Sequence, residues 1–164
     1  MTMRRLLLLS GLLGAFVLLT AGCGGGSDAP TTGEYEQAVA NAVDRTDFAF
    51  NRVARAQSLE EAVKRMGEAA VAIDSAAGDL EELGAPAAFE KDNEKLVKAL
   101  EDLGNDIGLT GQQIEDPAFR DAFLGRGTQG LNFESWDRAN LALGGLVGAG
   151  LRVKTLQRQA APPE

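Results

Sequence analysis

The sequence predicts an all-α protein, an antiparallel up-and-down four-helix bundle with a short extra helix between its third and fourth long helices. Apolar residues recur with helical spacing in long stretches, and no stretch shows the strict alternation typical of a strand. Short turn sequences connect the first three predicted helices. Long helices of matched length with short joints pack against each other in antiparallel order. We expect a signal peptide and a flexible tether before this bundle.

The first two helices meet at a capping signal. The first is expected from Gly33 to Gln57, with Thr31 or Thr32 as its cap. Ser58 and Glu61 have the spacing of a capping box, in which each side chain bonds the other residue's backbone N–H, so the second helix begins there. Helical spacing predicts the inner faces: Tyr35, Val39, Ala42, Ala49 and Val53, then Leu59, Val63, Met66, Ala70, Ile73, Ala77 and Leu80.

Gly84 and Pro86 mark the next joint, because glycine ends helices and proline is favoured in a first turn. Each glycine inside the third helix costs about 1 kcal/mol relative to alanine, which leaves a kink or break near Gly104-Asn105 open. If the chain folds back about residue 124, Gly104 lies near Gly144 in a close helix crossing. The inner residues are Phe89, Leu96, Leu100, Leu103, Ile107 and Ile114, with Asn93 and Thr110 as polar interruptions.

The short helix and the last long helix complete the bundle. Asp116-Pro117 opens an amphipathic helix to about Leu124, and residues 125–130 are expected to form a loop. The last helix begins near Asn132 or Ser135 and runs to about Arg158. Its uncharged run, residues 139–151, has thirteen residues. That is too short to span a bilayer, so we interpret it as a buried core helix.

The amino-terminal segment has the order of a secretory signal peptide, which is basic, then apolar, then small. Arg4 and Arg5 precede sixteen uncharged residues, 6–21, and Gly22 and Cys23 follow. A membrane-spanning helix is the alternative. Sixteen residues at about 1.5 Å each cover only about 24 Å of a hydrocarbon core about 30 Å thick, which favours the signal peptide.

The end of this run, Leu19-Thr20-Ala21-Gly22-Cys23, resembles the lipobox of bacterial lipoproteins. The resemblance implies cleavage between Gly22 and Cys23, a diacylglycerol on the Cys23 sulfur, and retention at the outer face of the cytoplasmic membrane. Thr20 departs from the pattern, because leucine is commonest at that position. The mature part resembles uncharacterised Ala-rich helical lipoproteins of Gram-positive bacteria in its helix pair joined by residues 83–87, Leu-Gly-Ala-Pro-Ala. This second likeness transfers no functional residue.

The predicted organisation has four parts: residues 1–22 as signal peptide, 23–32 as lipidated cysteine and flexible tether, 33–159 as the bundle, and 160–164 as a disordered tail. The mature chain keeps 14 basic and 24 acidic residues, a net charge of −10. That charge argues against a nucleic-acid partner. It also repels an anionic membrane surface, which leaves the lipid on Cys23 as the expected attachment to the bilayer.

Composition excludes several kinds of site. The chain has no histidine, which excludes histidine-based catalytic triads and zinc sites, and its single cysteine excludes an internal disulfide. Two acidic groups remain for metal or acid–base chemistry, and neither has the spacing of a calcium loop. We interpret both as solvated faces and expect no cofactor, no metal and no enzymatic activity. The two groups are Asp79, Glu81 and Glu82, and Glu101, Asp102 and Asp106.

We therefore predict a membrane-anchored extracytoplasmic lipoprotein whose bundle serves as an interaction or envelope-structural domain, with a protein partner in the cell envelope. The alternative is an extracytoplasmic protein that binds a small ligand in a pocket inside the bundle. In that case the Gly-rich last helix lines the pocket rather than packing closely. The residues expected there are Phe133, Trp136, Asn140 and Asn93.

Overall fold

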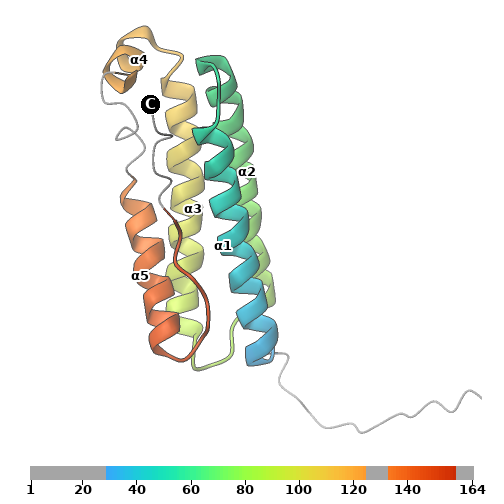
Figure 1. Ribbon diagram of the computed structural model, residues 1–164. Coiled ribbons are helices and arrows are strands. Elements are labelled where there is room, and N and C mark those ends of the chain that lie inside the picture. Colours follow the sequence, from blue (N-terminus) through green and yellow to red (C-terminus); the bar gives the residue numbers. More distant parts are fainter. Residues whose placement is uncertain (1–28, 125–132, 158–164) are drawn as a thin grey trace, which may run out of the picture.

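The computed structural model describes residues 29–124 and 133–157, and within these it contains five α-helices and no strand. The predicted all-α class is therefore confirmed. The long helices alternate in direction along the bundle, and the short α4 caps one end (Figure 1). The helices are α1 (Thr32–Ala54), α2 (Leu59–Leu83), α3 (Glu90–Gln113), α4 (Pro117–Leu124) and α5 (Glu134–Gly148).

Local capping residues set the helix starts. Thr31 and Glu34 form a complete capping box, with 2.9 Å from the Thr31 N to Glu34 Oε2. Ser58 Oγ accepts from the backbone N–H of Glu61, as predicted. The Glu61 carboxylate, however, accepts from the N–H of Gln57 rather than that of Ser58. Gln57 therefore belongs to the joint, and α1 ends at Ala54, before the predicted Gln57.

The buried core follows the predicted periodicity. All the inner residues expected in the first and third helices are buried, and in α2 only Leu59, Val63 and Ala70 are partly exposed. Helix α1 packs on α2, α2 on α3, and α3 on α5. Among the described helices, none is long and apolar enough to cross a membrane.

Helix α3 differs from its prediction in two places. It begins at Glu90, and Pro86 lies in the preceding turn, where its carbonyl accepts from the Phe89 N–H at 2.8 Å. It also continues without a break through Gly104. A Cβ added at Gly104 would lie 3.2 Å from the Ala70 backbone oxygen of α2. The glycine therefore permits a close α2–α3 approach, which compensates for its low helix propensity.

The predicted crossing of Gly104 with Gly144 is wrong. Gly104 faces α2, whereas a Cβ added at Gly144 would meet nothing within 4 Å. The glycine of α5 that packs closely is Gly145, whose added Cβ would lie 2.7 Å from a carboxylate oxygen of Asp92 in α3. The close contact of α5 with α3 is therefore made one residue later than expected.

Helix α5 also ends earlier than predicted, at Gly148 instead of about Arg158. Gly150 has φ +112°, a conformation that L side chains rarely adopt, and it reverses the chain. Residues 151–157, which we call the strap, then run back in extended form between α5 and α1 (Figure 1). The strap fills the side of the bundle on which α1 and α5 do not pack closely against each other.

The predicted short helix is confirmed as α4, and Asp116 caps it by accepting from the Ala118 N–H at 2.8 Å. Several predictions fall outside the described residues. They concern the signal peptide, Cys23 with its cleavage site, most of the tether, the loop at 125–130, and the tail at 160–164.

Candidate functional site

Side chains of α1 and α5 form hydrogen bonds with the backbone of the strap. Glu36 Oε2 accepts from the Arg152 N–H at 2.8 Å, and Asp47 Oδ1 accepts from the Gln157 N–H at 2.9 Å. Asn140 of α5 bonds both backbone groups of Leu156, accepting from its N–H at 2.7 Å and donating to its carbonyl at 3.4 Å. These four bonds satisfy an extended segment that has no regular ladder of its own.

Two leucines anchor the strap in the core. Leu151 is 2% exposed and Leu156 is 4% exposed, while Val153 between them is partly buried. Fully burying a leucine side chain contributes about 1.5–3 kcal/mol. The apolar contacts therefore provide most of the free energy that holds the strap, and the hydrogen bonds fix its position.

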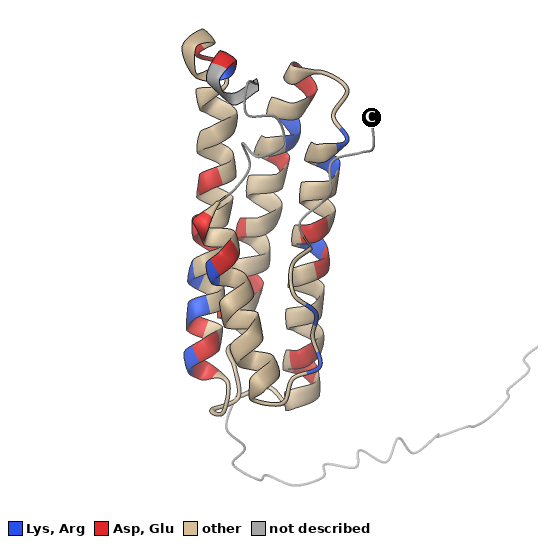
Figure 2. Cartoon of the chain, turned by 60° about the vertical axis from the view of Figure 1, so that its left-hand side comes forward, with Lys and Arg blue, Asp and Glu red and all other residues tan. Residues whose placement is uncertain are grey.

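Charge pairing adds a third kind of contact. Lys154 Nζ lies 2.6 Å from Asp44 and 3.9 Å from Asp47, and Arg152 pairs with Glu36 at 3.6 Å. The blue residues of the strap accordingly lie beside red residues of α1 in Figure 2, where most of α5 is uncharged. We call Glu36, Asp44, Asp47 and Asn140 together the strap site.

Two pKa values reflect this arrangement. Burial raises the pKa of Asp47, although the Gln157 N–H and the Lys154 ammonium act in the opposite direction. The hydrogen bond to Asp44 raises the pKa of Lys154. Lys154 is therefore charged at neutral pH, and it offsets part of the unfavourable burial of the Asp47 carboxylate.

Of the four residues predicted to line a pocket, Phe133, Trp136 and Asn140 lie within two turns of each other at α5, and Asn93 lies apart from them. Phe133 and Trp136 pack edge-on against Phe50 of α1, with ring centroids 6.4 and 4.7 Å from that of Phe50. Trp136 is 5% exposed, and its Nε1 finds no acceptor in the described part of the chain. Asn140, one turn further along α5, belongs to the strap site.

Asn93 lies toward the other end of the bundle. Asp92, which is next to Asn93 in α3, faces Gly145 near the end of α5. Trp136 lies near the start of α5, next to Ser135, which bonds Asp106 further along α3. Asn93 Oδ1 accepts from the Tyr35 hydroxyl at 2.9 Å. Burial raises the pKa of Tyr35, so this hydroxyl stays protonated and donates. Asn93 thus satisfies a buried polar group of the core.

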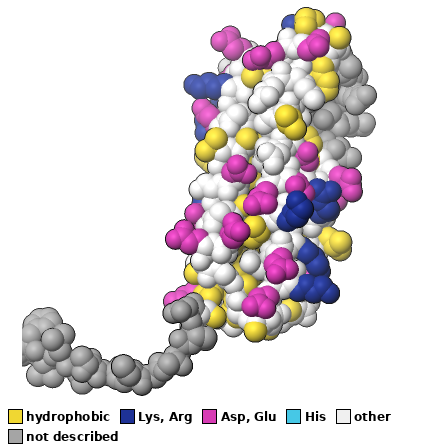
Figure 3. Space-filling model, turned by 180° about the vertical axis from the view of Figure 1, so that it is seen from behind, with side chains coloured by type: hydrophobic (Ala, Val, Ile, Leu, Met, Phe, Trp, Pro, Cys, Tyr) yellow, Lys and Arg dark blue, Asp and Glu magenta, His cyan; other side chains and the backbone are white. Residues whose placement is uncertain are grey.

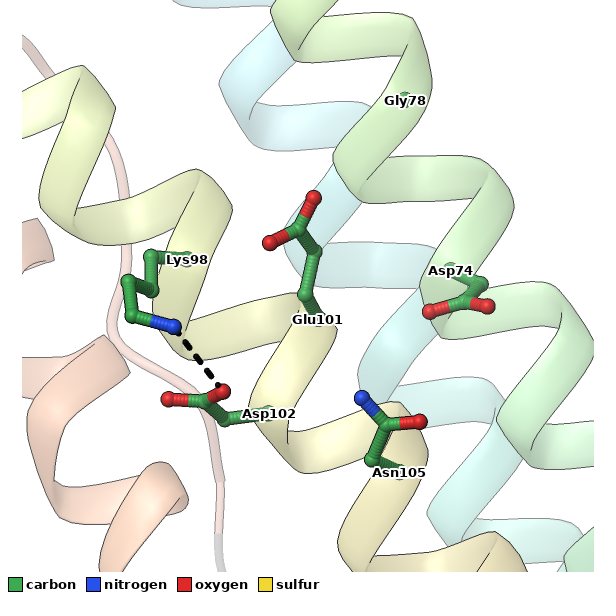
Figure 4. Close-up of a pocket in the computed structure, with 6 residues that line it drawn as sticks. All are labelled: Asp74, Gly78, Lys98, Glu101, Asp102 and Asn105. Carbon is green, nitrogen blue, oxygen red and sulfur yellow. Dashed lines mark hydrogen bonds and ion pairs between the residues drawn. The ribbon is translucent and has the colours of Figure 1, made fainter.

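Two residues of the predicted acidic group in the third helix, Glu101 and Asp102, border an open hollow of about 450 Å³ between α2 and α3 (Figure 4), whereas Asp106 bonds Ser135 of α5. Asp102 pairs there with Lys98 at 3.3 Å and with Arg138 of α5 at 2.9 Å. Asp74 of α2 points toward α3 across the hollow. In residues 29–124 and 133–157, no group of three or more acidic or cysteine side chains is arranged to hold a metal ion. Of the other predicted acids, Asp79 pairs with Arg45.

On the face opposite the strap, the described residues form a mixed polar surface. In Figure 3 acidic side chains are spread over its whole height, and hydrophobic side chains show as separate small patches. The most exposed large hydrophobic residues, Leu141, Val71 and Phe48, lie on three different helices. Isolated exposed apolar residues of this kind are normal for a protein surface.

Sequence reasoning missed the strap and three of its partners, Glu36, Asp44 and Asp47. One available signal was the pair Gly148 and Gly150, which punctuates the predicted helix. Another was the alternation of apolar and basic residues from Leu151 to Lys154, which is the spacing of an extended segment.

Among protein-family models, curated proteins and solved structures, none matches this chain. Its fold and its strap site are therefore interpreted from its own residues and geometry.

Proposed function

We propose that this chain is a bacterial lipoprotein, held at the outer face of the cytoplasmic membrane through Cys23, whose bundle serves as a non-enzymatic interaction or envelope-structural domain. One observation carries the proposal. Cys23 ends a lipobox-like sequence and stands only eight residues before Thr31, the cap at which the bundle begins. A lipid on that sulfur would attach the bundle directly to the membrane.

The position of α1 supports this geometry. Helix α1 starts at the end of the bundle that also carries the α2–α3 joint and the turn after α5 (Figure 1). Eight residues reach at most about 28 Å when fully extended. The anchored end would then stay within that distance of the bilayer, with α4 at the far end and the strap site along the side.

Charge and composition support an interaction role. The mature net charge of −10 keeps the bundle off an anionic bilayer, so its sides stay accessible to other proteins. Without histidine, and with one cysteine at the anchor, the chain lacks the residues of common nucleophile–base pairs.

The anchor is tested by expressing the full chain and a Cys23→Ser variant in a bacterium that processes lipoproteins. We expect wild type to partition with membranes and to have the mass of residues 23–164 plus a diacylglycerol. The Cys23→Ser chain is expected to stay uncleaved and to gain no lipid mass, because the acceptor sulfur is missing. Detergent phase partition and intact-protein mass spectrometry measure both outcomes.

A matched control is Thr20→Leu, which changes the same segment toward the commoner lipobox residue and is expected to leave processing intact. Wild-type protein without lipid mass contradicts the proposed anchor. Wild-type protein that stays in the membrane uncleaved and without lipid mass instead supports a retained helical anchor.

The interaction role is tested separately by native mass spectrometry of the mature chain released from the envelope. We expect the mass of the polypeptide alone, and crosslinking in intact cells is expected to join it to another envelope protein. A reproducible small extra mass, with no crosslinked protein, supports the alternative of a small-ligand-binding protein.

A further inference from the structure

The strap contacts define what kind of chain the strap site accepts. Apart from the Lys154–Asp44 contact, every hydrogen bond between the strap site and the strap goes to a backbone N–H or carbonyl of the strap. Backbone recognition of this kind does not depend on the sequence of the bound segment. The strap site therefore suits an extended peptide, and selectivity has to come from a few side chains.

Three strap positions supply that selectivity. Leu151 and Leu156 are buried, and Lys154 meets the carboxylates of Asp44 and Asp47. By contrast, the Arg152 side chain is 89% exposed and Thr155 is also exposed. The matching pattern is an aliphatic residue, a cation three positions later, and a second aliphatic residue two positions after that.

The contacts of the strap also allow it to dissociate from the bundle while the helices stay folded. It joins α5, whose last residue is Gly148, through a turn that contains Gly150, and it forms no part of a helix or sheet. Its ion pairs are partly exposed, and pairs of that kind contribute little to stability. Segments with few regular contacts open locally while the rest of a protein stays folded.

We infer that the strap site is a docking site for an extended basic and aliphatic segment of a partner protein, and that the strap is its intramolecular competitor. This inference rests on the proposed interaction role and deepens it. Charge favours a partner over a second copy of this chain, because two mature chains of net charge −10 repel each other, whereas a basic segment is attracted to Glu36, Asp44 and Asp47. An intramolecular strap acts at high effective concentration, so a partner binds well only when the strap is displaced.

The test measures binding of a fluorescent peptide with the sequence of residues 150–158, GLRVKTLQR, to the full mature chain. Wild type is expected to bind weakly. A Leu151→Asp/Leu156→Asp variant, whose strap no longer fits, is expected to bind at least about tenfold more tightly because the competitor is gone. Fluorescence of Trp136, the single tryptophan, reports the event independently, since Trp136 lies one helical turn from Asn140.

Matched variants assign the contacts. A peptide with the Lys154→Glu change is expected to bind at least about tenfold more weakly, because it places a negative charge beside two carboxylates. Adding Asp44→Asn and Asp47→Asn to the strap-released protein is expected to remove the preference for the basic peptide. Adding Glu101→Gln, an exposed change on α3, is expected to leave binding unchanged.

A second variant keeps the test decisive if the double aspartate variant does not fold. Gly150→Ala strains the turn at φ +112° without altering either leucine, so it is also expected to increase peptide affinity. The inference is overturned if a folded strap-released variant does not bind the peptide, or binds the Lys154→Glu peptide equally well. A strap-exchanged dimer of wild type in sedimentation experiments also overturns it, by making a second copy the occupant.

A result that overturns the docking-site inference is distinguishable from one that overturns the proposed function. If the peptide does not bind, but lipidated protein still crosslinks through another face of the bundle, only the strap-site inference is lost. If Cys23 carries no lipid, the proposed anchor is lost and the peptide measurement is unaffected.

Discussion

Two sides of the same bundle are closed in different ways. On the α2–α3 side the helices contact each other directly, and Gly104, Gly108 and Gly111 bring α3 close to α2. On the α1–α5 side the strap lies between the helices, held by the strap site and by two buried leucines. The first side is a packed helix pair, and the second is a helix pair with a peptide bound between them.

The difference teaches where this molecule can change shape. Separating α2 from α3 exposes the inner faces of two long helices, which amounts to unfolding. Releasing the strap exposes only the contacts of seven residues, 151–157, and leaves the other helix contacts in place. Local release of the strap on the α1–α5 side therefore requires less free energy than separation of the helices on the α2–α3 side.

The largest expected effect comes from truncating buried leucines on the two sides. Leu103→Ala in α3 is expected to lower the free energy of unfolding by about 2–5 kcal/mol, because it leaves a cavity in the core. Leu156→Ala in the strap is expected to cost less, because its effect cannot exceed the free energy that keeps the strap bound. Denaturant unfolding measures both changes.

Hydrogen exchange sharpens this comparison. Leu156→Ala is expected to speed exchange at Arg152 and Gln157 while α3 amides keep their wild-type rates. Leu103→Ala is expected to speed exchange throughout α3. If Leu156→Ala accelerates α3 as much as the strap, the two sides open together and the comparison is wrong.

A smaller effect is expected from filling glycine positions. Gly104→Leu is expected to lower the free energy of unfolding by about 1–3 kcal/mol, because the added Cβ meets the Ala70 carbonyl oxygen at 3.2 Å. Gly144→Leu is the matched control in α5, where a Cβ meets nothing. It is expected to melt no lower than wild type, because leucine favours the helix. Equal destabilisation by both changes would restore a close Gly104–Gly144 crossing.

Local features of the fold were predictable from sequence, because each depends on neighbours a few residues away. The cap at Ser58, the start of α4 after Asp116 and the buried faces of α1 and α3 all follow from spacing within one or two turns. The end of α5 had only a weak local signal, Gly148 and Gly150, because a helix also tolerates glycine at a cost of about 1 kcal/mol. Residues 151–157 contain nothing that forbids a helix, and their extended form depends on contacts with α1 and α5.

The strap site was less predictable than the fold. Asp47 bonds a residue 110 positions away and Glu36 one 116 positions away, so no local pattern relates them. In the sequence these carboxylates resemble any solvated helix face. Trp136 and Asn140 were expected to take part in a site, but the structure gives them packing and strap-binding roles instead of a shared pocket.

The smallest expected effect is a pH dependence of strap binding through Asp47. Burial raises the pKa of Asp47 above its ordinary value of 3.8, so the folded state holds this proton more tightly than the unfolded state does. By linkage, the stability contributed by Asp47 is fully present below pH 3.8 and is lost as pH rises through the raised pKa. Relative to an Asp47→Asn variant, wild type is therefore expected to lose stability across that interval.

Glu34 provides a control of opposite sign on the same helix. Its hydrogen bonds with Thr31 lower its pKa, so the stability that it contributes is lost as pH falls, and Glu34→Gln should remove that loss. Denaturant unfolding of the three proteins between about pH 3 and pH 7 spans the ordinary carboxyl range. If wild type instead gains stability over Asp47→Asn as pH rises, the Lys154 ammonium and the Gln157 N–H outweigh burial at Asp47. The ionised Asp47 carboxylate would then stabilise the bound strap at neutral pH, and a basic peptide would displace the strap less easily.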